Sequence, residues 1–298
     1  MTTATVALEA SARLRRGQVY VALAAIAWST AGVLQRQLTL DTSTQVFGRA
    51  AFAGAALLAY VAVVDRGRVL RAFRSVGLAG VAVALCVATA SGSFIAALNH
   101  TSVARVLFIM AVAPVMAAVL ARVTLGEPIT RRTVLAMALA LVGVAVMLGA
   151  PSEGSLVGDG LAFVAALAFA VMVVITRWRR DVSMAPATCL SQVILVLVFL
   201  PFASPGQIGG DDVVWLAALG ICQIGLGFAL LTVGARLIPA AQVGLITLLE
   251  VVLGPVWVWL ALDERPSTVT LVGGAIVIAA IVIQTRSAPT RTGALSAH

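Results

Sequence analysis

The chain has 298 residues, of which 61% are hydrophobic and only 11% are charged, and its mean hydropathy is +1.07. This balance excludes a soluble domain, which needs far more polar surface to stay in water. All 20 basic residues are arginine. The absence of lysine excludes a Walker A phosphate loop, and with it ATP-driven pumping by this chain, and it also excludes a retinal Schiff base.

The net charge of +8 is carried by arginines in short segments between apolar runs. Lipid headgroups explain such an arrangement better than nucleic acid, which is not expected as a partner. Cys86, Cys189 and Cys222 lie in apolar runs without C-x-x-C pairing, and His100 and His298 are far apart. We therefore expect no disulfide framework, no metal site and no cofactor.

Ten apolar runs follow one another along the chain, and each is long enough to cross a bilayer core of about 30 Å as a helix. Arg13, Arg15 and Arg16 precede the first run as in a signal peptide. Because nine further runs follow, we interpret the first as a retained helix. The seventh run is the weakest, since it is short, contains Gln192 and ends at Pro201. The predicted spans are 19–35, 45–64, 76–98, 103–121, 133–149, 158–176, 187–203, 213–234, 240–262 and 269–285.

The arginines are distributed unevenly between the two sets of loops. If the N-terminus is cytoplasmic, the outside loops hold only Arg36 and Arg265. The positive-inside rule therefore predicts a multi-pass protein of the cell (inner) membrane with both termini in the cytoplasm. The outside loops also collect acidic residues, namely Asp41, Glu153, Asp159, Asp211, Asp212, Asp263 and Glu264.

The two halves of the chain resemble each other at a shift of about 137 residues. Residues 97–104 precede a span that ends in Leu125-Gly126-Glu127, and residues 234–241 precede one that ends in Leu262-Asp263-Glu264. Chance similarity between two apolar segments is the alternative. An odd number of spans per half places the second half upside down, so we predict an all-α membrane protein of ten transmembrane helices in two inverted five-helix repeats. The predicted parts are a cytoplasmic segment 1–17, repeats 18–150 and 151–286, and a cytoplasmic tail 287–298.

Several stretches, in this order and spacing, carry a resemblance to a known family over nearly all of residues 18–285. The chain resembles the drug/metabolite transporter superfamily, in its EamA-like branch. The resemblance implies ten helices around a central cavity, and frequent export of amino acids, metabolites or toxic compounds. The stretches are Ala27-Trp28-Ser29-Thr30, Phe47-Gly48-Arg49, Ala97-Leu98 with Thr101-Ser102, Pro114, Leu125-Gly126-Glu127, Leu248-Leu249-Glu250, Leu262-Asp263-Glu264 and Gly273.

The chain departs from the family pattern at three places. Val251 stands where the family commonly has proline after the glutamate of the ninth span, and Pro255 follows one turn later. Phe169 is the second-half counterpart of Trp28, and Leu262-Asp263-Glu264 replaces Leu-Gly-Glu. These departures concern local helix geometry rather than family membership.

Glu250 is the first candidate for substrate binding or coupling, because it lies near the middle of a span, where an ionisable group is costly. It would bind a cationic or amine group of the substrate, or take up a proton and couple export to proton entry. The alternative interpretation, which the sequence supports equally, is a structural role in which the Glu250 carboxylate pairs with an arginine or a hydroxyl group inside the bundle.

Arg49 and Arg105 lie about one turn inside the outer leaflet. Each side chain either snorkels to the headgroups or faces the cavity, where it would attract a substrate carboxylate or pair with Glu250.

Trp28 lies near the centre of the first span, beside Ser29 and Thr30, and suggests a cavity wall. With Phe94 and other aromatic residues it would stack on planar or cationic solutes, although packing between helices explains it at least as well. Gln223, Gln242 and Thr247 are candidates for hydrogen bonds to a substrate, and helix-to-helix hydrogen bonds are their alternative role.

Pro114, Gly254 and Pro255 are predicted hinge positions, because they break or soften helices near the depth of the cavity. Glu127 and Glu264 close corresponding spans at opposite faces, which suits either gates near Arg131, Arg132 and Arg265 or solvated loop charges.

Taken together, these features favour a secondary transporter that exports small organic solutes as a monomer or homodimer in the lipid bilayer, with proton coupling as one option for its energy source. A membrane scaffold or receptor and an uptake carrier remain alternatives. An enzyme is not expected, because no span combines a nucleophile with a base or pairs two carboxylates.

Overall fold

The computed structural model describes residues 3–149, 155–263 and 265–285, and in this part of the chain all regular structure is helical. Ten of its helical segments are long and apolar enough to cross a membrane, as predicted. The helices of the first half are α1 (Thr3–Ser29), α2 (Ala31–Gln35), α3 (Thr42–Val64), α4 (Val69–Leu98), α5 (Val103–Met110), α6 (Ala113–Leu125) and α7 (Arg131–Leu148).

The second half contains one long π-helical segment and two short 3-10 turns among its α-helices. Its helices are α8 (Leu156–Trp178), α9 (Ala185–Phe199), η1 (Leu200–Phe202), η2 (Pro205–Gln207), α10 (Gly210–Ala217), the π-helix η3 (Ala218–Gly225), α11 (Leu226–Gly234), α12 (Ala240–Thr247), α13 (Leu249–Leu262) and α14 (Thr268–Thr285).

Side-chain caps mark where several helices begin. The Asp41 carboxylate accepts hydrogen bonds from the Thr44 amide (3.0 Å) and hydroxyl (2.6 Å) at the start of α3. Ser102, Thr130 and Ser155 cap α5, α7 and α8 in the same way, which satisfies amide groups that the helix leaves without a partner. The left-handed backbone of Gly126 (φ 68°) ends α6. Short polar caps thus fix the helix ends at the two faces of the bundle.

The helix of the third span begins earlier than hydropathy predicted. α4 begins at Val69, ahead of the predicted start at residue 76, and its backbone is non-helical at Gly77 (φ 54°). The segment before this kink carries Arg71 and Arg74 and packs through Ala72 against Val61 and Ala185. The predicted start therefore coincides with a kink between an amphipathic turn and the apolar helix.

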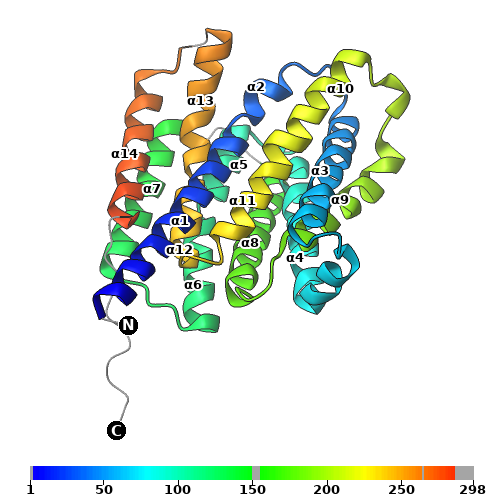
Figure 1. Cartoon of the computed structure of the whole chain (residues 1–298). Coiled ribbons are helices and arrows are strands. Elements are labelled where there is room, and N and C mark those ends of the chain that lie inside the picture. Colours follow the sequence, from blue (N-terminus) through cyan, green and yellow to red (C-terminus); the bar gives the residue numbers. More distant parts are fainter. Residues whose placement is uncertain (1–2, 150–154, 264, 286–298) are drawn as a thin grey trace.

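The bundle has two faces, which we name by the chain ends. The terminal face carries both ends of the described chain and loops 65–68, 126–130, 179–184 and 235–239, and the far face carries loops 36–41, 99–102 and 203–209 (Figure 1). At the terminal face, the Gln18 side-chain amide donates a hydrogen bond to the Thr285 carbonyl (3.2 Å). The ten spans therefore start and finish on the same face.

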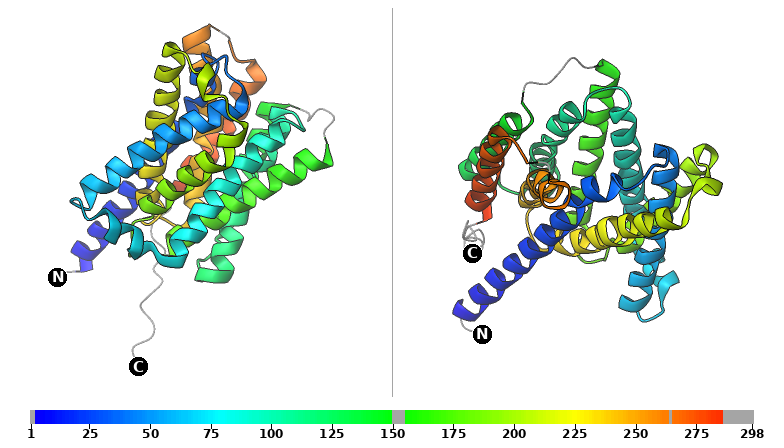
Figure 2. Two further views of the ribbon diagram at one scale, coloured as in Figure 1. Left: turned by 90° about the vertical axis from the view of Figure 1, so that its right-hand side faces the viewer. Right: turned by 90° about the horizontal axis from the view of Figure 1, so that it is seen from above.

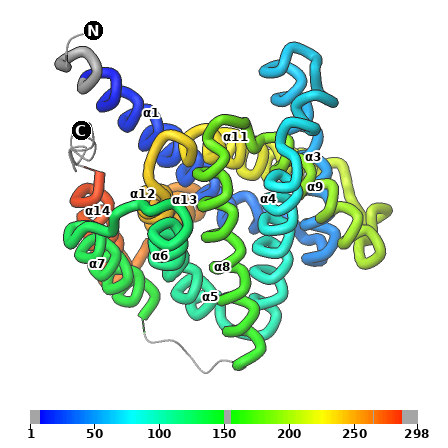
Figure 3. The backbone as a smooth tube through the Cα atoms, turned by 90° about the horizontal axis from the view of Figure 1, so that it is seen from below, coloured from blue at the N-terminus to red at the C-terminus, as the bar shows by residue number. Residues whose placement is uncertain are grey.

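Helix packing repeats itself when the two halves are exchanged. α4 packs on α8 and α11 packs on α1, while α6 contacts α8 just as α13 contacts α1 (Figure 2, Figure 3). The pairs α3 with α9, α6 with α12 and α7 with α14 each join equivalent spans of the two halves. Five spans per half and this exchange pattern give the predicted pair of inverted repeats.

The pair α7 and α14 lies at one edge of the bundle (Figure 3) and is held by close backbone contact. A Cβ atom on Gly143 would lie 2.9 Å from the Gly273 carbonyl oxygen, and one on Gly273 would lie 2.5 Å from the Met147 nitrogen. Small residues permit this approach, because association in lipid depends on close packing rather than on hydrophobic burial.

Candidate functional site

Two equivalent spans are interrupted in mid-membrane. The fourth span breaks at Ala111 and Val112, between α5 and α6, and the ninth span breaks at Leu248, between α12 and α13. The breaks at Ala111 and Leu248 are separated by the same shift of about 137 residues that relates the two sequence halves. Each span therefore consists of one half toward the terminal face and one toward the far face.

The terminal-face halves of these two spans interlock. Every residue of α12 except Ala241 is buried, and a Cβ atom on Gly244 would lie 2.7 Å from the Cα of Pro114 in α6. In the far-face halves, by contrast, Val106 is the one buried residue of α5 and Val252 the one buried residue of α13. The terminal-face halves of the two spans are therefore more deeply buried in the bundle than the far-face halves.

Glu250 lies in the first turn of α13, on the far-face side of the break. Its side chain is half-buried, and its carboxylate forms no hydrogen bond or ion pair with the residues that the structure describes. The N-terminal end of a helix favours a negative charge. The structure therefore places an acid without a described partner where the deeply buried half of the ninth span meets its less buried half.

Trp28 is almost completely buried, and its ring packs edge-on against Phe228 (5.3 Å between centroids) and Phe169 (6.2 Å). The indole nitrogen is enclosed beside Gly227 and has no hydrogen-bond partner among the described residues. These contacts join α1 to α8 and α11. These contacts agree with the alternative interpretation of Trp28, in which its ring packs between helices instead of lining a cavity.

Ser29 and Thr30 lie where α1 gives way to α2. The Ser29 hydroxyl accepts a hydrogen bond from the Trp257 indole (2.8 Å) and donates one to the Ile26 carbonyl (2.7 Å). Thr30 and Trp257 line a cavity of about 250 Å³ between α1, α2 and α13. The end of the first span is thus tied directly to the far-face half of the ninth.

Arg49 and Phe94 line a second cavity, of about 120 Å³, toward the far face. Arg49 is half-buried and, within the described parts of the chain, makes neither a hydrogen bond nor an ion pair. The other residues around the cavity are Gln35, Thr42, Gln45, Val46, Ile95, Leu98, Asn99 and Leu219.

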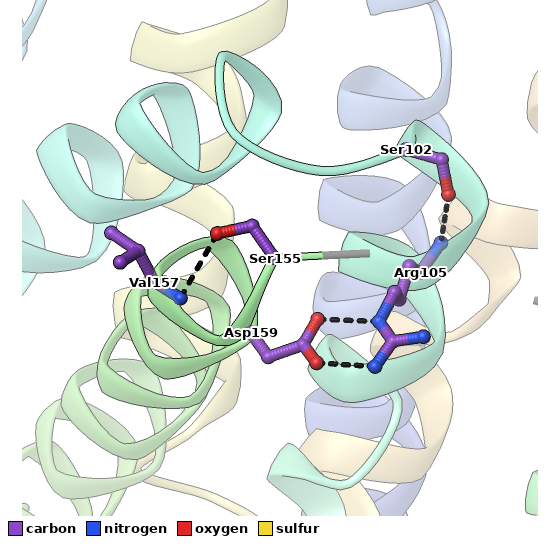
Figure 4. A network of polar contacts seen from close by, with 5 residues as sticks. All are labelled: Ser102, Arg105, Ser155, Val157 and Asp159. Atoms are coloured by element: carbon purple, nitrogen blue, oxygen red, sulfur yellow. Dashed lines mark hydrogen bonds and ion pairs between the residues drawn. The ribbon is translucent and has the colours of Figure 1, made fainter. Parts of the chain in front are cut away.

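Arg105 binds Asp159 of α8, a partner that neither sequence interpretation included. The Arg105 Nε donates to Asp159 Oδ1 (2.6 Å) and Nη2 donates to Oδ2, so the guanidinium and the carboxylate meet side by side (Figure 4). Ser102 and Ser155 cap the first turns of the same two helices. Arg105 therefore ties the two halves of the protein together near the far face.

The three neutral polar candidates lie in different parts of the bundle. Gln242 accepts a hydrogen bond from Gln18 (3.4 Å) near the terminal face, and the Thr247 hydroxyl donates to the Gly244 carbonyl of its own helix (2.7 Å). Gln223 is buried in the π-helix η3, and its side-chain oxygen has no partner among the described residues. Of these three, Gln223 alone retains a buried hydrogen-bonding group that the fold does not use.

Among the predicted hinges, Pro114 lies in the first turn of α6, at the break of the fourth span. Gly254 and Pro255 lie inside α13, beyond the break at Leu248. The residues that interrupt the ninth span in this conformation are therefore not the glycine and proline that the sequence suggested. Bending at Gly254 and Pro255 during transport stays a prediction.

Sequence reasoning missed Arg177 at the end of α8. Its Nε donates to Glu127 Oε1 (2.7 Å), its Nη1 donates to the Arg236 carbonyl (2.8 Å), and Glu127 Oε2 accepts from the Ala240 amide (3.0 Å). We call Glu127, Arg177, Arg236 and Ala240 the terminal-face latch. Arg131 and Arg132, the expected neighbours of Glu127, lie in α7, and Glu264 lies outside the described residues.

Comparison with known proteins agrees with this geometry. The model of the EamA-like transporter family matches residues 15–149 and matches a second time over residues 156–286. The chain belongs to the EamA-like transporter family. It is also 28% identical over 279 residues to a protein of Archaeoglobus fulgidus described as "Uncharacterized transporter", covering 92% of this chain and 97% of that protein.

The EamA fold is also found in a solved structure described as "Crystal structure of protein". The match has a TM-score of 0.79 and covers 90% of this chain and 96% of that chain, at 19% sequence identity. At this identity the likeness shows the shared fold. With the family assignment, the chain is a multi-pass membrane transporter of the drug/metabolite superfamily.

Proposed function

We propose that the protein exports small organic solutes across the cell (inner) membrane by alternating access, and that proton entry drives the export. The observation that carries this proposal is the pair of equivalent broken spans, whose halves interlock toward one face and are less buried toward the other. In inverted repeats, exchanging the conformations of the two halves reverses which face is open. The same residues then bind solute on one side and release it on the other.

We assign the terminal face to the cytoplasm. Its loops carry Arg66, Arg68, Arg179, Arg180 and Arg236. The positive-inside rule favours this orientation, because arginines in short loops stay on the cytoplasmic side. The conformation described here is then closed to the cytoplasm and open to the outside.

Glu250 is the proposed coupling residue. It lies in the first turn of α13, just past the break of the ninth span, half-buried and without a partner among the described residues. A carboxylate in such a position either holds a cationic group of the solute or takes up a proton that displaces it. Competition between the two would link solute release outside to proton binding from the outside.

The experiment loads proteoliposomes with a panel of amino acids and cationic dyes and imposes a pH gradient. Wild-type protein is expected to show flux that grows with the gradient, and Glu250→Gln should keep only the gradient-independent part. Glu9→Gln removes an exposed acid near the start of α1 and serves as the matched control. Gradient-dependent flux that survives in Glu250→Gln would overturn the coupling role, and no flux in any variant would favour a scaffold or receptor.

A further inference from the structure

The second cavity, which we call the Arg49 cavity, is defined by Gln35, Gln45, Arg49, Phe94 and Asn99 together with their apolar neighbours. It lies between α3, the far-face end of α4, α2 and η3. The backbone at Arg49 is held firmly, because a Cβ atom on Gly220 of η3 would lie 2.6 Å from the Arg49 carbonyl oxygen. Close packing on the π-helix therefore fixes the position from which the arginine side chain enters the cavity.

The charge of Arg49 is not balanced by the protein around it. Asp159 binds Arg105 and Glu127 binds Arg177, both at distances of 2.7 Å or less. Among the described residues, no acidic side chain lines the Arg49 cavity, and Arg49 has no hydrogen-bond or ion-pair partner. A guanidinium stays charged in proteins, and a half-buried charge without a counter-ion is unfavourable. The cavity therefore attracts anions.

The neutral polar residues and the apolar lining of the cavity indicate which kind of anion it would bind. The Gln35 side-chain amide donates to Gln45 (3.2 Å), and the Gln45 amide donates in turn to the Leu40 carbonyl (2.8 Å). Among the lining residues the guanidinium is the charged donor, beside the ring of Phe94 and the apolar residues Ile95 and Leu98. The Thr42 hydroxyl and the Asn99 amide add neutral donors. A planar fork of N–H groups next to an apolar wall suits an organic carboxylate, which accepts two parallel hydrogen bonds.

We propose that the Arg49 cavity is a binding subsite for the carboxylate group of the transported solute, with an apolar or aromatic part of that solute against Phe94. This proposal rests on the proposed transport function and names the class of its substrate. The volume of about 120 Å³ suits a small organic acid. In the outward-open conformation, the subsite holds the solute by its charge before release to the outside.

The test is calorimetric titration of the purified full-length protein in detergent with phenylacetate. The neutral 2-phenylethanol has the same ring and chain length, and sodium chloride supplies an inorganic anion. Wild-type protein should bind phenylacetate about tenfold or more tightly than the alcohol, as expected for a charge-assisted hydrogen-bonded pair. Chloride should compete only weakly, because it cannot accept two parallel hydrogen bonds from one guanidinium fork.

Arg49→Gln should weaken phenylacetate binding to the level of the alcohol, and Arg49→Lys should lie between, since lysine keeps the charge but lacks the fork. Arg66→Gln removes an exposed arginine of the terminal face and should bind like wild type. If Arg49→Gln does not fold, the titrations of the wild-type protein and of Arg49→Lys still show whether phenylacetate binding depends on the guanidinium of Arg49.

Equal binding of acid and alcohol by wild type, or unchanged acid binding in Arg49→Gln, would overturn the subsite. Displacement of phenylacetate by an equal concentration of chloride would overturn the carboxylate assignment. Flux of cationic dyes in proteoliposomes does not depend on this subsite. A negative titration beside positive dye flux would therefore reject the subsite and leave the transport function standing.

Discussion

Three arginines within or at the ends of spans differ in what surrounds them. Arg105 and Arg177 each bind a carboxylate from another helix, whereas Arg49 meets no partner in the described parts of the chain. Arg49 and Arg105 were open to the same two interpretations in the sequence, and Arg177 was not singled out there. The difference lies in which helix packs against each arginine, and it separates two structural ties from one candidate binding group.

The Glu127–Arg177 pair gives a prediction for stability. Both side chains are largely buried, with 19% and 16% exposed. Removing one partner by Glu127→Gln or Arg177→Ala should lower the unfolding free energy by about 1–3 kcal/mol, because the other group keeps an unpaired charge. Thermal unfolding of the purified protein in detergent measures this loss.

A double-mutant cycle supplies the control for that pair. If the ion pair carries the effect, the combined variant should lose less than the sum of the two single losses. Strictly additive losses would show that Glu127 and Arg177 act through their backbone partners, Ala240 and Arg236, and not through each other.

Asp41, in a loop of the far face, gives a pH-dependent prediction. Hydrogen bonds from the Thr44 hydroxyl and amide lower the pKa of Asp41 below its ordinary value. A carboxylate with a lowered folded-state pKa stabilises the fold above its unfolded-state pKa, and this contribution disappears as the pH falls through the folded-state value. The stability difference between wild type and Asp41→Ala should therefore be full at pH 6 and shrink below about pH 4.

Thermal unfolding across this pH range checks the Asp41 prediction, with Glu9→Ala as an exposed acid without a cap role. A difference between wild type and Asp41→Ala that stays constant from pH 6 to the acid end would mean that the cap acts without its charge.

At the scale of elements, α6 and α12 cross in close contact at the terminal-face halves of the two broken spans. Gly244 allows the ninth span to lie directly on Pro114, and both helices are buried around this point. The far-face halves α5 and α13 lack such a contact point among their described residues, since each buries a single residue. The two broken spans therefore form a pair that is joined at one end.

Gly244→Ala should destabilise the protein by about 1–3 kcal/mol, since the added methyl group meets backbone and cannot be accommodated by a rotamer change. Gly160→Ala is the matched control, because nothing lies within 4 Å of the added atom. In a helix that control should be neutral or slightly stabilising. Chemical unfolding of both variants in detergent compares them, and equal stability would show that the α6–α12 contact relaxes easily.

At the scale of the whole molecule, the two inverted halves are joined by ties at both faces. The Arg105–Asp159 pair links them near the far face, and the terminal-face latch links them at the opposite end. In the proposed inward opening Glu127 would separate from Arg177 or Ala240, since the three residues lie at the ends of three different spans. The latch thus lies on the path of the proposed conformational change.

Single cysteines in a cysteine-free background test this picture by labelling with a membrane-impermeant maleimide. Phe94→Cys lines the Arg49 cavity and should react from outside the cell, whereas Val243→Cys is fully buried in α12 and should not. Combining Val243→Cys with Glu127→Gln should raise its labelling in inverted vesicles, as the terminal face opens more often. Labelling of Val243→Cys from outside in the parent background would contradict the outward-open assignment.

Ten spans, their approximate limits and the family resemblance follow from local sequence, because an apolar run of given length crosses a bilayer whatever surrounds it. The position of Glu250 near the middle of the ninth span also follows from the sequence, whereas its role in coupling stays a prediction. The same local reasoning placed the start of the third span at the Gly77 kink, and it did not predict the break at Leu248 in the ninth span. Leu248 is neither glycine nor proline, so the sequence has no local signal for this break, and bending at Gly254 and Pro255 stays a prediction.

Only the tertiary structure shows which ends of the spans lie against each other. Arg177 lies 50 residues from Glu127, and Arg105 lies 54 residues from Asp159, so hydropathy and spacing contain no information about either pair. The same holds for Trp28, whose ring is enclosed by Phe169 and Phe228 from the other half. The lipid solvent determines that helices form and how long they are, whereas contacts between helices determine which polar side chains are paired and which remain available to a solute.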